Sequence, residues 1–303
     1  MAAVSTQPAP GIHSGLGGSA HAQAKPDKHD VAYDMMYFAL EGTPAPFHMG
    51  RSQWRYDSKS PSRPGTVLGP MKTLPVTIHD ISGEEDKYTL DTYGFQFVKH
   101  ESKEKGFHDV EKIKAEYYPE TEQLVKDVTG ASRTFVFNHA IRRQPVEAAD
   151  GSVPGRGPTY NAHIDQTYGD APNRVRRYFP DEADELLKKR YQIINVWRPI
   201  KTILKDPFAV VDARTVPDED IIPVTMVYPN AVDEKGACRP NPDHVWYYKY
   251  AQRPDEPMLF KNFDSATDGK ARRNPHSAFV DPAHVNDYMR ESIEVRVLTF
   301  FDD

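Results

Sequence analysis

The stretch Asn161-Ala162-His163-Ile164-Asp165-Gln166-Thr167 is the one around which the rest of the chain can be arranged. It follows residues 150–158, where three glycines and two prolines exclude regular structure, so the chain enters an extended segment just before His163. In a strand, side chains two residues apart share a face, so His163 and Asp165 can bind one cation together. A second histidine from a distant strand would complete the ligand set of non-heme Fe(II) oxygenases, two imidazoles and one carboxylate. By itself the pair also fits two ordinary surface residues.

The composition limits the classes of partner. The net charge of -6 over 303 residues provides no basic field for nucleic acid. The single cysteine, Cys238, excludes an intrachain disulfide and a cysteine-rich zinc site, and it suits a reducing compartment. No apolar run approaches the roughly 20 residues that a membrane-spanning helix needs. We therefore expect a cytoplasmic protein that binds neither nucleic acid nor a membrane, with its oligomeric state left open.

The chain divides into an arm and one domain. Residues 1–30 are rich in Ala, Gly, Pro, Ser and His and lack the features of a secretory signal, so we expect a mobile N-terminal arm. No internal linker interrupts residues 31–303, which we expect to form a single domain.

The pattern of the domain is mostly that of strands. Residues 110–130 show helical spacing that Pro119 interrupts and Gly130 ends, and residues 180–190 suit a short helix. Residues 78–87 look like a connection. Apolar, β-prone segments predict strands at residues 33–39, 93–98, 134–137, 191–197, 208–211, 224–228, 245–250, 258–260 and 292–301. Such a series after a helical N-terminal third predicts a mainly β fold with flanking helices (α+β), a double-sheet jelly roll or double-stranded β-helix.

Four histidines compete for the third ligand position: His139, His244, His276 and His284. We favour His276, because Asn274-Pro275 forces a turn directly before residues 277–280 and places His276 at the entrance of a strand. A plain loop histidine remains the alternative.

The last strand carries a polar stripe. Arg290, Ser292, Glu294 and Arg296 alternate with apolar residues, so they share one face. An arginine beside a hydroxyl can bind a carboxylate, whereas a solvated face with a paired Glu and Arg is the competing interpretation.

Several ordered motifs between about residues 93 and 301 resemble the Fe(II)/2-oxoglutarate-dependent oxygenases, and more narrowly their hydroxylase/desaturase group. That group includes a relative of the small chain of cephamycin 7α-methoxylase and many fungal natural-product enzymes. The motifs are Tyr160–Thr167, Asn195–Pro199, Asp212–Arg214, Lys261–Ser265, Pro275-His276 and Arg290–Arg296.

The resemblance implies an iron- and 2-oxoglutarate-dependent dioxygenase that uses O2. His163, Asp165 and His276 would bind Fe(II), and Arg290 with Ser292 would bind the far carboxylate of 2-oxoglutarate. Decarboxylation of 2-oxoglutarate to succinate would accompany hydroxylation, desaturation or cyclisation of a small secondary metabolite derived from an amino acid, polyketide or terpenoid.

The resemblance also leaves roles open. Arg296 could replace Arg290 as the cofactor clamp, with Asn195 beside it. Candidates for substrate binding are Thr167, Trp197, Arg198 and Arg142, although Trp197 could equally fill the core and Arg142 could end a basic strand at the surface.

Two other functions compete with the oxygenase. A jelly-roll protein could bind a small molecule without turnover. A zinc hydrolase could use the same ligands, although the chain lacks the His-Glu-X-X-His motif.

Overall fold

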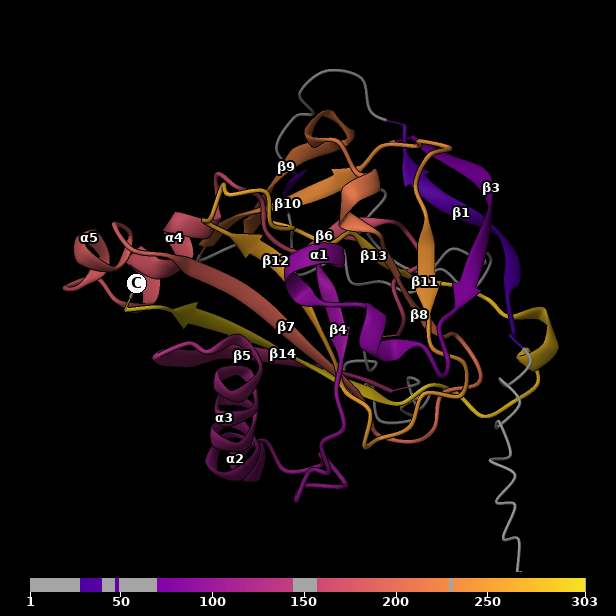
Figure 1. The fold of residues 1–303 in the computed structure, drawn as a ribbon, viewed down its shortest axis with the longest axis horizontal. Coiled ribbons are helices and arrows are strands. Elements are labelled where there is room, and N and C mark those ends of the chain that lie inside the picture. The colour runs from indigo at the N-terminus through magenta and orange to yellow at the C-terminus, as the bar shows by residue number, and fades with distance from the viewer. Residues whose placement is uncertain (1–27, 40–46, 49–69, 144–156, 229–230, 303) are drawn as a thin grey trace, which may run out of the picture.

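Two β-sheets face each other in the computed structural model, which describes residues 28–39, 47–48, 70–143, 157–228 and 231–302 (Figure 1). The strands of the larger sheet are, in spatial order, β1 (Val31–Phe38), β3 (Met71–Asp80), β11 (Trp246–Tyr248), β8 (Phe208–Val211), β13 (His276–Ala278), β6 (His163–Ile164), β10 (Ala231–Cys238), β9 (Ile221–Tyr228) and β2 (Phe47–His48). The strands of the smaller sheet are β4 (Phe95–Phe97), β12 (Met258–Asp264), β7 (Tyr191–Pro199), β14 (Ser292–Phe300) and β5 (Arg133–Arg142). The expected jelly roll with flanking helices is confirmed.

The central strand β7 of the smaller sheet is buried at every residue, which indicates that both faces of this sheet are covered. Ile194 and Val196 pack on the outer face together with Leu124 and Val125 of the helix beside the sheet in Figure 1. Trp197 belongs to the cluster of rings on the opposite face, between the sheets. Odd-numbered residues of β7 therefore face the interior of the roll, and even-numbered residues face the helix.

The helical region over residues 110–130 is confirmed, but Pro119 does not end it. The region consists of α2 (Val110–Lys112), a π-helical turn (Ile113–Tyr117) and α3 (Tyr118–Thr129). Pro119 lies in the first turn of α3, directly after the π-helical turn, so the change of helix type rather than an end of the helix coincides with the proline. Gly130 ends the helix with a φ of 75°, a conformation that glycine adopts at little cost.

The remaining helices are short. They are α1 (Leu90–Tyr93), α4 (Ala171–Tyr178), α5 (Ala183–Leu186) and the 3-10 turns Glu85–Lys87, Ala213–Thr215, Asp218–Asp220 and Pro282–His284. The expectation of a helix within residues 180–190 is confirmed by α5, but α4 was not foreseen. Residues 78–80 belong to β3 rather than to a connection, and residue 93 ends α1 rather than beginning a strand. Along the described residues, every helix is too short or too polar to span a lipid bilayer.

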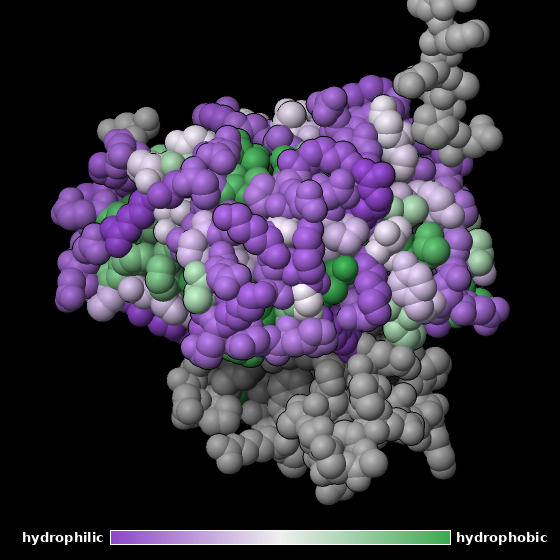
Figure 2. Space-filling view, turned by 90° about the horizontal axis from the view of Figure 1, so that it is seen from below, coloured by the Kyte–Doolittle hydropathy of each residue, from purple (hydrophilic) through white to green (hydrophobic). Residues whose placement is uncertain are grey.

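Packing begins before the expected domain boundary. Residues 1–27 lie outside the described part, but Lys28 donates to the carbonyl oxygen of Ser82 at 2.6 Å, and His29 contacts Asp281 at 2.8 Å. The last residues of the expected arm are therefore anchored to the domain. The described surface in Figure 2 is mostly hydrophilic, with small separate hydrophobic patches.

Candidate iron and 2-oxoglutarate site

The residue pairing within the larger sheet brings three candidate ligands together. His276 pairs directly with His163 across β13 and β6, and their ring centroids lie 4.5 Å apart. His163, Asp165 and His276 are all buried, and each offers one ligand atom within 4.8 Å of the others. Side-chain alternation in β6 turns Ala162 and Ile164 into the core of the larger sheet and leaves His163 and Asp165 on the other side. The structure therefore places His276 beside the pair, as expected.

Backbone carbonyls fix both imidazoles. Nδ1 of His163 lies 2.8 Å from the carbonyl oxygen of Asn161, and Nδ1 of His276 lies 3.2 Å from that of Asn274. In each ring Nδ1 therefore carries the proton and donates, which leaves the lone pair of Nε2 for a metal. The amide of Asn274 donates to the carbonyl oxygen of Val211 at 2.5 Å and so holds the turn before β13.

The two oxygens of Asp165 have different surroundings. Oδ2 accepts hydrogen bonds from Nη2 and Nε of Arg296 at 2.6 and 2.9 Å, and from Nδ2 of Asn195 at 3.1 Å. Oδ1 lies 4.0 Å from Nε2 of His163 and 3.5 Å from Nζ of Lys235. Among the described residues, the oxygen turned toward the histidines is thus held by a single cation, the flexible Lys235 side chain, which is 36% exposed.

The protonation states suit a divalent cation. Burial lowers the pKa of His163 well below its usual value, and the neighbouring His276 adds to the shift. Burial also lowers the pKa of His276. Burial opposes ionisation of Asp165, but the charges of Arg296 and Lys235 outweigh it, so the pKa of the carboxyl lies well below its usual range. At neutral pH the set consists of two neutral imidazoles and one carboxylate, the forms that bind metals.

A small cavity lies against the two histidines. Its lining residues are Arg142, Thr159, His163, Phe208, His276, Ala278, Arg290 and Glu294. The rings of Phe208 and Phe260 pack on His276, with centroid distances of 5.4 and 4.7 Å. The surroundings of the triad therefore combine aromatic rings with the guanidinium groups of Arg142 and Arg290.

Arg290 has an unusual environment for a cation. It is 3% exposed, its Nη1 donates to the carbonyl oxygen of Asp206 at 2.9 Å, and its Nε has no hydrogen-bond partner among the described residues. The buried hydroxyl of Ser292 likewise has no partner there. Burial, together with the charge of Arg142, lowers the pKa of Arg290 to about 9. A buried guanidinium and hydroxyl with unused donors fit the carboxylate of a small anion.

The structure separates the two arginines that the sequence left as alternatives. Arg296 is bound to Asp165, and its Nη2 also contacts Oε1 of Glu294 at 2.7 Å. Asn195 donates to the same two carboxylates. Both side chains hold Asp165, so the donor groups that the structure leaves for a cofactor carboxylate are those of Arg290 and Ser292 rather than of Arg296 and Asn195.

Three residues that we expected to contact the substrate, Trp197, Arg198 and Thr167, are not among the residues that line the cavity. Arg198 faces the helix side of β7, where its guanidinium donates to the Tyr117 hydroxyl and to the backbone oxygens of His100 and Pro254. Trp197 is fully buried and stacks on Phe208, with centroids 4.9 Å apart. These placements give Arg198 partners on the helix side of the sheet and favour core packing for Trp197.

The side chain of Thr167, which lies shortly before α4, is already engaged in hydrogen bonds. Its hydroxyl donates to Glu234 and accepts from the backbone N–H of Asp170. Arg142 does line the cavity, and its Nη1 donates to the carbonyl oxygen of Gly157 at 2.8 Å. Of these two candidates for substrate contact, Arg142 lines the cavity and Thr167 does not.

Two neighbours of Asp165 had no predicted role, although Asn262 lies within the Lys261–Ser265 motif of the resemblance. Lys235 reaches it from β10, a strand that was not predicted. Asn262 accepts a hydrogen bond from the backbone N–H of Asp165 at 3.1 Å, and it lies where the pairing of β12 with β7 shifts register. A bulge of this kind can redirect one side chain, and single-sequence patterns do not reveal it.

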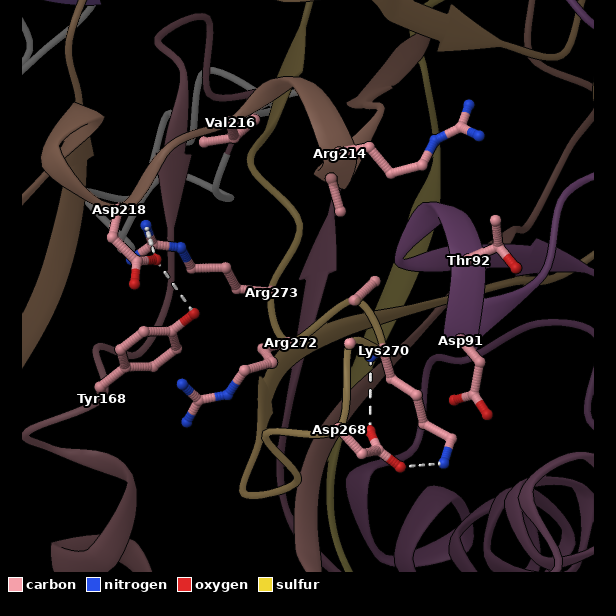
Figure 3. Close-up of a pocket in the computed structure, with 13 residues that line it drawn as sticks. Asp91, Thr92, Tyr168, Arg214, Val216, Asp218, Asp268, Lys270, Arg272 and Arg273 are labelled. Carbon is pink, nitrogen blue, oxygen red and sulfur yellow. Dashed lines mark hydrogen bonds and ion pairs between the residues drawn. The ribbon is translucent and has the colours of Figure 1, made fainter.

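A larger surface hollow of about 590 Å³ lies elsewhere and contains none of the three candidate ligands (Figure 3). Its charged groups pair with one another: Nη2 of Arg273 lies 2.6 Å from Oδ1 of Asp218, and Nζ of Lys270 lies 2.5 Å from Oδ2 of Asp268. Tyr168 donates to Asp218 and packs against the guanidinium of Arg272. Size alone does not make this hollow the reaction site, because the metal-ligand chemistry is in the smaller cavity.

Comparisons with known proteins agree with this geometry. A family model described as "Oxidoreductase/YMDC permease-like domain" matches residues 37–300. Hydroxylase/desaturase efuI of Hormonema carpetanum is 38% identical over 260 residues, which cover 79% of this chain and 88% of that protein. Alpha-ketoglutarate-dependent dioxygenase phiK of a fungal species is 37% identical over 220 residues, or 71% of this chain and 80% of that protein.

The fold is also similar to a solved structure of the iron and alpha-ketoglutarate-dependent endoperoxidase NvfI. The TM-score is 0.72 at 26% identity, over 90% of this chain and 98% of the other. The chain therefore belongs to the oxidoreductase family that the model describes and, within it, to the Fe(II)/2-oxoglutarate-dependent dioxygenases of the hydroxylase/desaturase type.

Proposed function

We propose that residues 31–303 act as one domain that uses Fe(II), 2-oxoglutarate and O2 to oxidise an unactivated C–H bond of a small secondary metabolite. His163, Asp165 and His276 would hold the iron. The observation that carries the proposal is their convergence within 4.8 Å, in the protonation states that a divalent cation requires. When bound, iron and 2-oxoglutarate would supply the activation of O2, with succinate and CO2 as co-products.

The chain's own residues would set the geometry of this reaction. The carbonyl oxygens of Asn161 and Asn274 hold the two imidazoles in the tautomer that presents Nε2. Arg296 and Asn195 hold Oδ2 of Asp165 and would leave Oδ1 to face the metal. Side chains fixed in this way need little reorganisation when the cation binds.

We assign the far carboxylate of 2-oxoglutarate to Arg290 and Ser292. The support is the unused donor capacity of both groups in a buried position beside the triad. A charged hydrogen bond in such a dry place is stronger than one at the surface. We assign an acidic or polar group of the substrate to Arg142, which lines the same cavity and is less buried than Arg290.

The class of product follows from the relatives only in outline, since their names include hydroxylase, desaturase and endoperoxidase. We propose hydroxylation, desaturation or cyclisation as the outcome, in the cytoplasm. A reducing compartment would suit the single cysteine, Cys238, which is buried and free.

The test measures succinate formed from 2-oxoglutarate with Fe(II) under air. His163→Ala and Asp165→Ala should each abolish succinate release and Fe(II) binding, with circular dichroism unchanged. His79→Ala is the control, because His79 lies on β3 and pairs with Asp30 outside the cavity. Retained, Fe(II)-dependent succinate release by Asp165→Ala would remove the proposal.

A further inference from the structure

A second group of two histidines and one carboxylate lies outside the site described above. His29, Asp281 and His284 each offer a ligand atom within 4.8 Å of the other two. His29 precedes β1, whereas Asp281 and His284 lie in the connection from β13 to β14; Figure 1 shows the start of β1 beside this connection. Segments about 250 residues apart in sequence thus bring the same set of ligand types together as in the iron site.

The contacts within this cluster resemble those of a structural metal site. Nε2 of His29 lies 2.8 Å from Oδ2 of Asp281, whose side chain is only 2% exposed. Oδ1 of Asp281 accepts from the backbone N–H of Ala283 at 3.0 Å, which fixes the carboxylate. Nδ1 of His284 lies 2.5 Å from Oδ2 of Asp287, so this nitrogen can donate and Nε2 is the acceptor, which the hydroxyl of Tyr250 contacts and a cation would take over.

A carboxylate behind a histidine is the usual support for a metal-binding imidazole, because it sets the tautomer and raises the basicity of the ligating nitrogen. Asp287 has this relation to His284. The hydroxyl of Tyr250 lies 3.0 Å from Nε2 of His284 and offers a fourth oxygen, or a partner for a bound water. Metal–ligand distances of about 2.0–2.2 Å place neighbouring ligand atoms roughly 3–3.5 Å apart, so small side-chain shifts would close the set.

We propose that His29, Asp281 and His284 bind a divalent cation of the zinc class. Two imidazoles and a carboxylate form a borderline donor set that suits Zn²⁺ rather than Ca²⁺ or Mg²⁺. The cation would tie the residues before β1 to the connection that leads from His276 to Arg290. This role is structural and does not depend on turnover at the iron site.

Zinc stoichiometry tests the proposal on the full chain with any purification tag removed. The protein is equilibrated with excess ZnCl2, dialysed, and measured by mass spectrometry of the metal. Zinc can also bind the iron ligands, so the wild type should hold two equivalents, His29→Ala one, His163→Ala one, and the double variant none. His79→Ala is the matched control, because His79 and Asp30 form an exposed pair 2.9 Å apart to which the described residues add no third ligand.

The zinc contents of the variants distinguish a failure of this proposal from a failure of the proposed function. If His29→Ala and His79→Ala bind equal amounts of zinc, the cluster is a hydrogen-bonded pair only and the inference is wrong. If His29→Ala loses one equivalent while His163→Ala loses none, the zinc site stands and the proposed iron site fails.

A thermal readout covers the case in which His29→Ala does not fold. Zinc should raise the Tm of His163→Ala by several degrees over the same protein in a chelator, since a ligand that binds only the folded state stabilises it. His284→Gln should remove this zinc-dependent rise in the same background. An unchanged Tm on zinc addition would overturn the proposal.

Discussion

Replacing Arg296 with methionine tests how the iron ligand Asp165 is held. The change removes hydrogen bonds of 2.6 and 2.9 Å to Oδ2 of Asp165 and a contact of 2.7 Å with Glu294. Both carboxylates are nearly fully buried and would then share Asn195 as a donor. Breaking a buried pair in this way costs about 3–5 kcal/mol of the free energy of unfolding.

The cost should depend on pH. In the wild type the pKa of Asp165 is depressed, so its contribution is present above the unfolded pKa and is lost as pH falls through the folded value. Without Arg296 the folded pKa of Asp165 rises, and protonation relieves the unpaired charge at a higher pH. The difference in stability between wild type and Arg296→Met should therefore narrow as pH falls from 7 toward 5.

The assays are urea unfolding of the metal-free protein at pH 7 and 5.5, and anaerobic calorimetry with Fe(II). Loss of a residue that orients a ligand lowers metal affinity about 10–100-fold. Arg174→Met is the matched control, since Arg174 forms a buried pair with Asp170 at 3.1 Å and should lose stability without losing Fe(II) affinity. Wild-type Fe(II) affinity in Arg296→Met, with a stability difference independent of pH, would refute the reasoning.

Four further substitutions test the neighbouring residues. Arg290→Met should raise KM for 2-oxoglutarate about 100-fold and Ser292→Ala roughly 3–10-fold. The affinity for Fe(II), measured by calorimetry, should not change. Variants with the wild-type KM would exclude Arg290 and Ser292 as the residues that bind the far carboxylate of 2-oxoglutarate. Gly236→Ala would place its Cβ 2.6 Å from Cγ2 of Ile221, so urea unfolding should show a loss of about 1–3 kcal/mol. Arg198→Met should cost stability by a similar or larger amount but leave KM for 2-oxoglutarate unchanged, because its donors face the helix side of β7; a raised KM would place Arg198 in the site after all.

Two local signals pointed to the triad, although neither is specific by itself. Residues two apart in an extended segment share a face, which sets His163 with Asp165. Asn274-Pro275 excludes a helix before His276 and so predicted the start of β13, which the structure confirms. The position of each segment in the sheet depends on pairing between distant strands. The pairing of His276 with His163 completes the set of three metal ligands.

The parts that the sequence could not predict have a physical reason. Strand β7 is buried on both faces, so no apolar–polar alternation shows that Asn195 faces the interior and Arg198 the helix. Arg290 and Arg296 share one stripe, and only the pairing of Arg296 with Asn195 places it at Asp165. Strand β10 contains acidic, basic and glycine residues without an apolar period, so Lys235 could not be placed.

Charge balance around Asp165 explains how one carboxylate can be both fixed and available. Its Oδ2 is held by Arg296, whose guanidinium is largely buried and fixed by several partners. Among the charged groups of the described residues, Lys235 makes the contact with Oδ1, at a longer distance and from a flexible, partly exposed side chain. Under the proposed function a divalent cation would repel this ammonium, which can move toward solvent at little cost, while the guanidinium stays. In the metal-free protein Lys235 stabilises the negative charge on Oδ1 of Asp165. The bound cation would stabilise the same oxygen instead, so the folded state would not lose this electrostatic contribution when Lys235 moves away.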